Sequence, residues 1–202
     1  MNPAVLVLLG VAGLGFVLVA STKHSQPSVV LVVGDSHSEA SWTFGGRLAA
    51  KLREAGLEAT VEGNRGKGVR WYLDSGTLDD AVSRVKPDTV IVELGGNDAV
   101  KGYPEATYAS YLSQFVDRLR AAGVERIIWL APTKHEGNPA SEQRRRKIAR
   151  WQRTHLLPLG VAWFDMHALT LDLPTRDGVH YDRDNYETWA TRAIEGPLES
   201  LV

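Results

Sequence analysis

The chain has 202 residues, a formal net charge of −1 and no cysteine, with 44% hydrophobic and 23% charged residues. This length and composition are those of one globular domain with a full hydrophobic core, and they exclude a disordered or fibrous chain. The near-zero net charge gives no reason to expect nucleic acid as a partner. The lack of cysteine excludes a disulfide framework, a thiolate nucleophile and cysteine-ligated zinc or iron–sulfur sites.

The N-terminus carries an unbroken apolar run over residues 4–20. At about seventeen residues it reaches the lower limit for a helix that spans a bilayer, so we predict a hydrophobic helix and possible membrane association. We interpret residues 1–27 as an anchor or signal segment with a short linker. An uncleaved anchor fits slightly better than a cleaved signal, because a cut after Ala20 would place Leu18 at the −3 position. A buried core helix is disfavoured by the lack of a polar face. A membrane-anchored or exported protein is therefore expected in preference to a cytoplasmic one.

From residue 28 onward, short β-branched runs alternate with longer amphipathic segments, and we interpret residues 28–202 as one domain. The predicted strands are 29–33, 57–61, 89–93, 126–130 and 161–164. The predicted helices are 40–55, 77–85, 104–122, 141–155 and 185–195. This alternation predicts a parallel sheet with helices on both faces, the doubly wound α/β class. Ligands of such sheets bind outside the carboxyl ends of the strands, so the residues after each strand are the candidates for chemistry.

The first predicted strand is followed by Gly34-Asp35-Ser36. A serine in a tight turn between a strand and a helix presents its hydroxyl at the top of the sheet, as a nucleophile requires. The simpler alternative is a capping box, in which Ser36 and Glu39 satisfy the first N–H groups of the next helix. By itself the tripeptide predicts a nucleophile only weakly.

Two further segments supply the other parts of a hydrolytic site. Gly95-Gly96-Asn97-Asp98 follows the third strand, and the Asn97 amide there can donate to a developing oxyanion. Asp177 stands three residues before His180, close enough to hold the imidazole Nδ1–H and leave Nε2 as a base. Ordinary turns and a surface histidine are the alternatives. Because the three segments fall at strand ends or loops in a coherent order, we predict a triad of Ser36, Asp177 and His180.

These three segments resemble the motif blocks of the SGNH (GDSL-like) hydrolase family, and the resemblance extends over residues 28–202. It implies a flavodoxin-like, doubly wound parallel sheet of five strands. It also implies hydrolysis of small-molecule or polysaccharide esters through an acyl-serine, without metal or cofactor. An oxyanion hole is implied from Ser36, Asn97 and a glycine after the second strand. Spacing from that strand favours Gly68, with Gly66 as the alternative.

His37 stands where many relatives carry a hydrophobic residue, and we predict that it lines the substrate pocket. Little sequence between the blocks remains to build a lid or acyl tunnel, so a small acyl group such as acetyl is expected. An acyltransferase with the same triad and a sugar hydroxyl as acceptor is the alternative enzyme. A non-catalytic glycan-binding module is disfavoured because Ser36, Asn97, Asp177 and His180 are all present.

Three other features have simpler interpretations. Residues 144–147 are four consecutive basic residues, and Arg150 and Arg153 follow them. We interpret this group as a solvated helix face, with attraction to an anionic membrane or polymer as the alternative. Asp165 and His167 are of metal-ligating types, but no third ligand stands at suitable spacing, so no metal site is predicted. For the aromatic residues that flank the presumed site loops, Trp42, Trp71 and Tyr72, core packing is favoured over sugar stacking.

Overall fold

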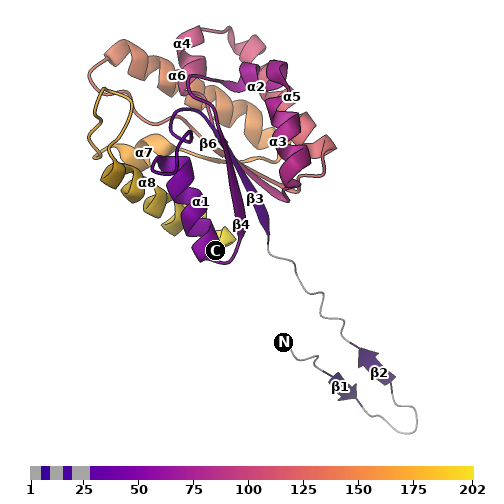
Figure 1. The fold of residues 1–202 in the computed structure, drawn as a ribbon. Helices are drawn as coiled ribbons and strands as arrows, with labels where there is room; N and C mark the ends of the chain where they lie inside the picture. The colour runs from indigo at the N-terminus through magenta and orange to yellow at the C-terminus, as the bar shows by residue number, and fades with distance from the viewer. Residues whose placement is uncertain (1–5, 10–15, 20–27) are drawn as a thin grey trace.

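The computed structural model describes residues 6–9, 16–19 and 28–202 (Figure 1). Its centre is a five-stranded sheet in which all neighbouring strands are parallel, in the order β4-β3-β5-β6-β7. The strands are β3 (Val29–Gly34), β4 (Glu58–Gly63), β5 (Thr89–Glu93), β6 (Arg126–Leu130) and β7 (Ala162–Phe164). The order reverses at β3, which has β4 on one side and β5 on the other. The carboxyl end of β3 is therefore the switch point at which such sheets bind ligands.

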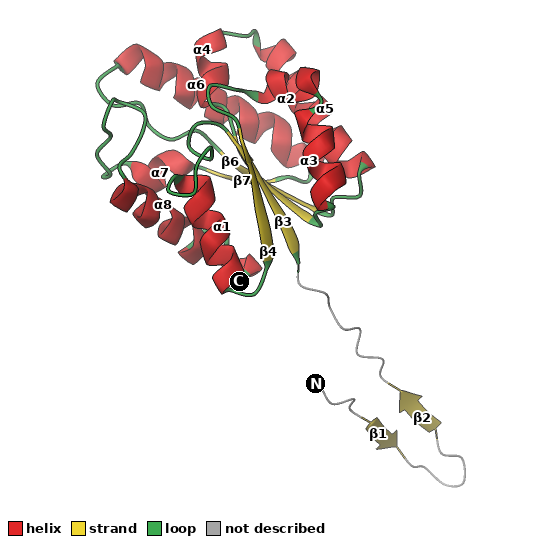
Figure 2. Ribbon diagram, viewed as in Figure 1, coloured by secondary structure: helices red, strands yellow, loops and turns green. Residues whose placement is uncertain are grey.

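Helices cover both faces of the sheet (Figure 2). One face carries α1 (Phe44–Glu54), α7 (Met166–Thr170) and α8 (Arg183–Glu195). The other carries α2 (Val69–Ser75), α3 (Thr77–Val85), α4 (Gly96–Lys101), α5 (Glu105–Ala121) and α6 (Pro139–Leu156). Short 3₁₀ helices follow at Leu157–Leu159 and Glu199–Leu201.

The apolar run of β3 is continuous because both of its faces are buried. Val30 and Val32 pack into the core beneath α1 and α8, whereas Leu31 and Val33 pack into the core beneath α2, α3 and α5. A strand buried on both faces has no polar alternation, as is usual for central strands of parallel sheets. This confirms the predicted doubly wound, flavodoxin-like α/β fold with five parallel strands.

The predicted N-terminal helix is not confirmed. Within residues 4–20, the structure has an antiparallel pair of strands, β1 (Leu6–Leu9) and β2 (Phe16–Val19). Four-residue apolar runs suit a strand as well as a helix, and the glycines at 10, 13 and 15 disfavour a continuous helix. The helix is therefore corrected to strands at these positions, and the rest of the segment lies outside the described residues. Among the helices that the structure describes, none is long and apolar enough to cross a bilayer.

Candidate active site

The turn after β3 places Ser36 at the carboxyl edge of the sheet. The Ser38 N–H donates to the Asp35 carbonyl oxygen at 3.0 Å, and the His37 N–H donates to Asp35 Oδ1 at 3.1 Å. Ser36 is 8% exposed. Helix α1 begins only at Phe44, so Ser36 does not cap that helix. The capping alternative is thereby excluded, and the Ser36 side chain is available for another role.

A second loop, between α7 and α8, brings His180 and Asp177 to Ser36. Ser36 Oγ lies 2.8 Å from His180 Nε2, and His180 Nδ1 lies 2.8 Å from Asp177 Oδ2. The other carboxylate oxygen of Asp177 accepts the backbone N–H groups of Val179 and His180 at 3.0 and 2.8 Å. Asp177 and His180 follow Ser36 by 141 and 144 positions in the sequence, and the three residues form one hydrogen-bonded chain.

The surroundings of Asp177 keep its carboxylate ionised. Desolvation is the largest single influence and raises the pKa of Asp177, but hydrogen bonds from the His180 backbone and ring and from Val179 hold that pKa well below its usual range. An ionised Asp177 keeps the His180 proton on Nδ1, which leaves Nε2 as an acceptor for the Ser36 hydroxyl. This arrangement can remove a proton from Ser36 and stabilise the imidazolium that results.

The predicted oxyanion donors lie on two neighbouring loops. Asn97, in the first turn of α4, donates through Nδ2 to Asp35 Oδ2 at 2.7 Å and to the Lys67 carbonyl oxygen at 3.1 Å. Among the hydrogen bonds of the described residues, none is donated by the backbone N–H of Ser36 or of Gly68. These two N–H groups are therefore available for a ligand, whereas the Asn97 amide would have to share its hydrogens.

Asp98 holds the loop that carries Gly68. Its carboxyl, which is 1% exposed, accepts the Val69 N–H at 3.1 and 3.3 Å. Burial raises the pKa of Asp98 to about 7. A Cβ added at Gly68 would lie 2.5 Å from Asp98 Oδ1, whereas Gly66 has φ +72° and open space around it. The sequence singled out the Gly-Gly-Asn-Asp segment, but not this contact of its aspartate with the glycine loop.

His37 lines the cavity that contains Ser36 and His180, and its side chain is buried. Its Nδ1 lies 2.9 Å from the Tyr186 hydroxyl, and its ring centroid lies 5.4 Å from those of His180 and Trp189. Burial lowers the pKa of His37 well below its usual value, with a further contribution from Arg145. A neutral imidazole packed among aromatic rings is a wall of the cavity and presents little polar surface to it.

Two buried carboxyl groups, those of Asp35 and Glu93, lie beside the turn that carries Ser36, and sequence reasoning missed Glu93. Glu93, the last residue of β5, approaches the Ser38 hydroxyl at 3.4 Å, and burial together with the charge of Asp35 raises the pKa of Glu93 well above its usual value. Burial also raises the pKa of Asp35. The sequence feature that could have indicated Glu93 is its position as an acidic residue at the end of an otherwise apolar, buried strand.

Asp35, His37 and Glu93 are the described residues that come closest to a metal site, since their ligand atoms lie within 4.8 Å of one another. Each already has a hydrogen-bond partner in the protein. Asp165 and His167, considered from the sequence, instead pair with Arg146 and Glu142 of α6. We interpret these two contacts as structural ion pairs.

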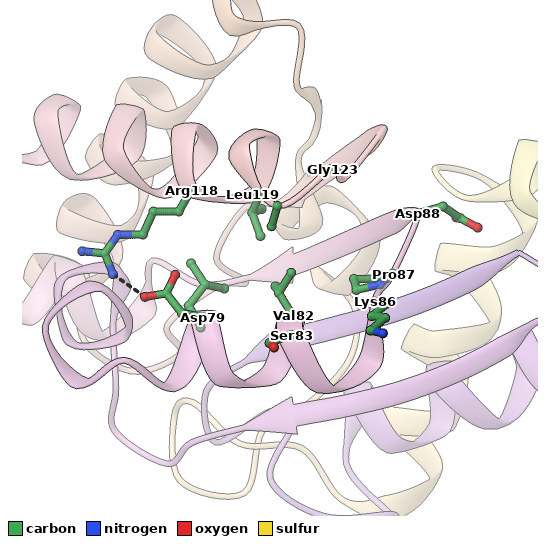
Figure 3. Close-up of a pocket in the computed structure, with 11 residues that line it drawn as sticks. Asp79, Val82, Ser83, Lys86, Pro87, Asp88, Arg118, Leu119 and Gly123 are labelled. Carbon is green, nitrogen blue, oxygen red and sulfur yellow. Dashed lines mark hydrogen bonds and ion pairs between the residues drawn. The ribbon is translucent and has the colours of Figure 1, made fainter.

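The cavity that contains Ser36 and His180 has a volume of about 200 Å³ and is bounded by Val100, His135, Ser141, Arg144, Arg145 and Val179, among others. A second cavity of about 440 Å³ adjoins it at Asn97 and is bounded by Trp71 and Tyr103. A larger cavity of about 550 Å³ lies between α3 and α5 (Figure 3). Its charged pair, Asp79 and Arg118, is already joined at 3.0 Å, and it contains none of the predicted site residues.

Comparison with known proteins gives the family. The GDSL-like lipase/acylhydrolase family model matches residues 32–187. An arylesterase of Vibrio mimicus is 29% identical over 120 residues, which are 56% of this chain and 58% of that protein, so the match spans little more than half of the relative. An aryl esterase of M. smegmatis shares the fold with a TM-score of 0.69 at 20% identity, over 87% of this chain and all of that one. Est24, a carbohydrate acetylesterase from Sinorhizobium meliloti, has a TM-score of 0.70 at 17% identity, over 88% and 100% of the two chains. The chain belongs to the GDSL-like lipase/acylhydrolase family, as its motifs predicted.

Proposed function

We propose that the protein is a serine esterase that hydrolyses carboxylic esters through an acyl-serine intermediate. The observation that carries the proposal is the chain of two 2.8 Å contacts from Ser36 through His180 to Asp177 at the switch point of the sheet. Membership of an acylhydrolase family supports it. So does the Vibrio relative, which is an arylesterase.

In the first half of the reaction, His180 Nε2 takes the Ser36 proton while Oγ attacks the ester carbonyl carbon. The carbonyl oxygen becomes an oxyanion, which the N–H groups of Ser36 and Gly68 and the Asn97 amide would stabilise. Loss of one such donor typically costs about 2.7–4 kcal/mol of barrier. His180 then returns the proton to the departing alkoxide, and the acyl group remains on Ser36.

In the second half, water loses a proton to His180 and attacks the acyl-serine. The ester bond to Ser36 breaks, Oγ regains the proton, and the carboxylic acid leaves. Throughout, the Asp177 carboxylate offsets the positive charge that His180 acquires. Apart from the ester and the water, the groups that act in these steps are residues of this chain.

We further propose a preference for small acyl groups, acetyl among them. The catalytic cavity of about 200 Å³ is below the range of about 300–1,000 Å³ that is usual for drug-sized ligands. The acetylesterase activity of Est24, which shares the fold, is compatible with this size. Whether the alcohol part is a small molecule or a polysaccharide is a matter for the assay.

Turnover of p-nitrophenyl esters of increasing chain length, beside acetylated polysaccharides, tests the proposal. We expect kcat/KM to be highest for the shortest acyl chains. Ser36→Ala should lower kcat by about 10³-fold or more, because triad members act as a unit. Ser83→Ala, on the exposed side of α3, is the matched control and should be unchanged. Turnover that survives in Ser36→Ala would overturn the mechanism, and transfer to an added sugar in place of acid release would indicate an acyltransferase.

The apolar segment at residues 4–20 supports a second proposal, that the protein is attached to a membrane or exported. The chain enters the domain at Ser28, whose hydroxyl donates a hydrogen bond to Asp88 Oδ1 at 2.6 Å. Ser28 precedes the amino end of β3, and Ser36 follows its carboxyl end. A strand of this length spans about 20 Å, so the catalytic edge would face away from the attachment point. The full-length protein should partition with membranes or be exported, and a shortened protein beginning at Gln26 should be soluble and equally active. A soluble, cytosolic full-length protein would contradict the proposal.

A further inference from the structure

The four consecutive basic residues at 144–147, within α6, differ in their surroundings. Arg146 forms a two-point ion pair with Asp165 at 2.9 and 3.0 Å, and Lys147 Nζ lies 4.5 Å from the centre of the Trp151 ring. Arg144 and Arg145, by contrast, both line the cavity that contains Ser36 and His180. The prediction that these basic residues form a solvated helix face therefore holds for only part of the run.

Arg145 is a buried cation on the wall of the catalytic cavity. It is 7% exposed, and its one hydrogen bond among the described residues runs from Nη1 to the Thr133 carbonyl oxygen at 3.3 Å. Within the described part of the chain it forms no ion pair. Its Nη2 lies 3.2 Å from where a Cβ on Gly96 would stand, so the guanidinium packs against the backbone directly before Asn97. The charge of Arg145 acts favourably on the buried carboxyl groups of Asp35 and Glu93, although neither forms an ion pair with it. A guanidinium has five N–H donors, so a ligand with acceptor oxygens can use those that Thr133 does not.

Arg144 stands beside it at the mouth of the same cavity. It is exposed, donates from Nη2 to the Ser141 hydroxyl at 2.8 Å, and is paired with no carboxylate of the described residues. The acidic residue that lines this cavity is Asp35, whose oxygens already accept the His37 N–H and the Asn97 amide. The cavity wall thus offers two guanidinium groups and no free carboxylate.

The adjoining cavity extends the same charge. Three basic residues, Lys67, Arg70 and Lys101, line it together with two acidic ones, Asp74 and Asp98. Arg70 is paired with Asp74, whereas Lys67 and Lys101 form no ion pair within the described residues. The whole protein has a net charge of −1, so a general excess of cations does not explain their accumulation on both sides of Asn97. In both cavities the basic residues outnumber the acidic ones, and a cleft with an excess of one sign of charge attracts substrates of the opposite sign.

We propose that Arg144 and Arg145 form a subsite for a carboxylate carried by the substrate, so that the preferred esters are anionic. The planar guanidinium fork matches a carboxylate with two parallel hydrogen bonds. The inference rests on the proposed esterase function and names the substrate class of that site. The carboxylate can belong to the acyl part or to the alcohol part of the ester, and the experiment separates the two.

The test compares each acid with its own methyl ester, which removes the charge and keeps the shape. 4-Acetoxybenzoate carries the carboxylate on the alcohol side, and monophenyl adipate carries it on the acyl side. We expect the acid to exceed its methyl ester in kcat/KM by about tenfold in one of the two pairs, since a hydrogen bond to a charged group has about that effect. The pair that shows the preference identifies the side.

Arg144→Gln should lower the ratio of acid to methyl ester by about tenfold. Lys147→Gln removes the same charge from the same helix outside the cavity, and should leave the ratio unchanged. Arg145→Gln is the second variant, with circular dichroism to verify its fold because the side chain is buried.

A ratio near one in both pairs, or an equal fall in Arg144→Gln and Lys147→Gln, would overturn the subsite. Cleavage of the neutral esters alone would overturn the subsite and leave the esterase proposal standing. If no ester of either kind is cleaved, the esterase proposal fails, and calorimetric titration with benzoate then decides the subsite. Binding that weakens in Arg144→Gln supports it, and no binding overturns it.

Discussion

Replacing Gly68 by alanine tests the oxyanion loop at its tightest contact. The added Cβ would lie 2.5 Å from Oδ1 and 2.7 Å from Oδ2 of Asp98, whereas ordinary contacts begin near 3.4 Å. Asp98 is 1% exposed and bonded to the Val69 N–H, so its carboxyl has little room to withdraw. The loop must instead shift by about 1 Å, and a misplacement of that size can cost about 10²-fold in rate.

We therefore expect Gly68→Ala to lower kcat on p-nitrophenyl acetate by about 10²-fold with little change in KM, because the displaced N–H acts on the transition state. Gly66→Ala is the control: φ there is +72° and nothing lies within 4 Å of the new Cβ. Its cost is backbone strain of about 1–2 kcal/mol, without contact with Asp98. A larger loss of kcat in Gly66→Ala would show that Gly66 is the donor. Near-normal kcat in a folded Gly68→Ala protein would refute the reasoning.

Two other substitutions test neighbouring parts of the site. Burial raises the pKa of Asp98 from 3.8 to about 7. Between these pH values the unfolded chain ionises this carboxyl while the folded protein keeps it neutral, so the stability of the wild type falls as the pH rises. In Asp98→Asn this loss is absent, so between pH 4 and pH 8 its free energy of unfolding should rise by about 4 kcal/mol relative to that of the wild type. Urea denaturation at each pH measures the difference. A difference that does not depend on pH would contradict this prediction. Asp177→Asn should lower kcat by about 10⁴-fold while the fold is kept, because the His180 ring would then favour the wrong tautomer. A loss below tenfold would show that Asp177 does not set that tautomer.

The sheet was predictable because its strands are short, apolar and regularly separated by helices. The strand at Thr89–Glu93 and the helix at Thr77–Val85 occur at the predicted residues. The short helices α2 and α4 were not predicted, because each has only a turn or two and follows a glycine-rich loop. The N-terminal segment illustrates a different limit. Short apolar runs have no periodicity that separates strand from helix.

Ser36, Asp177 and His180 could be brought together from the sequence because strand ends and loops in a doubly wound sheet meet at one edge. The hydrogen-bond partners and the burial of each side chain could not be predicted from the sequence. The Asn97 amide is engaged by Asp35 and Lys67, which no local motif reveals. Likewise, Arg145 is buried in the middle of a basic run, and only the tertiary packing separates it from its exposed neighbours.

Covalent labelling of the folded protein with a fluorophosphonate, followed by peptide mass spectrometry, tests the central claim most directly. The reagent reacts with a serine only where a base activates its hydroxyl and donors stabilise the anionic oxygen. We predict a single adduct, on Ser36, with labelling that is strongly slowed in His180→Ala. An adduct on another serine, or esterase activity that persists without any adduct on Ser36, would contradict the account.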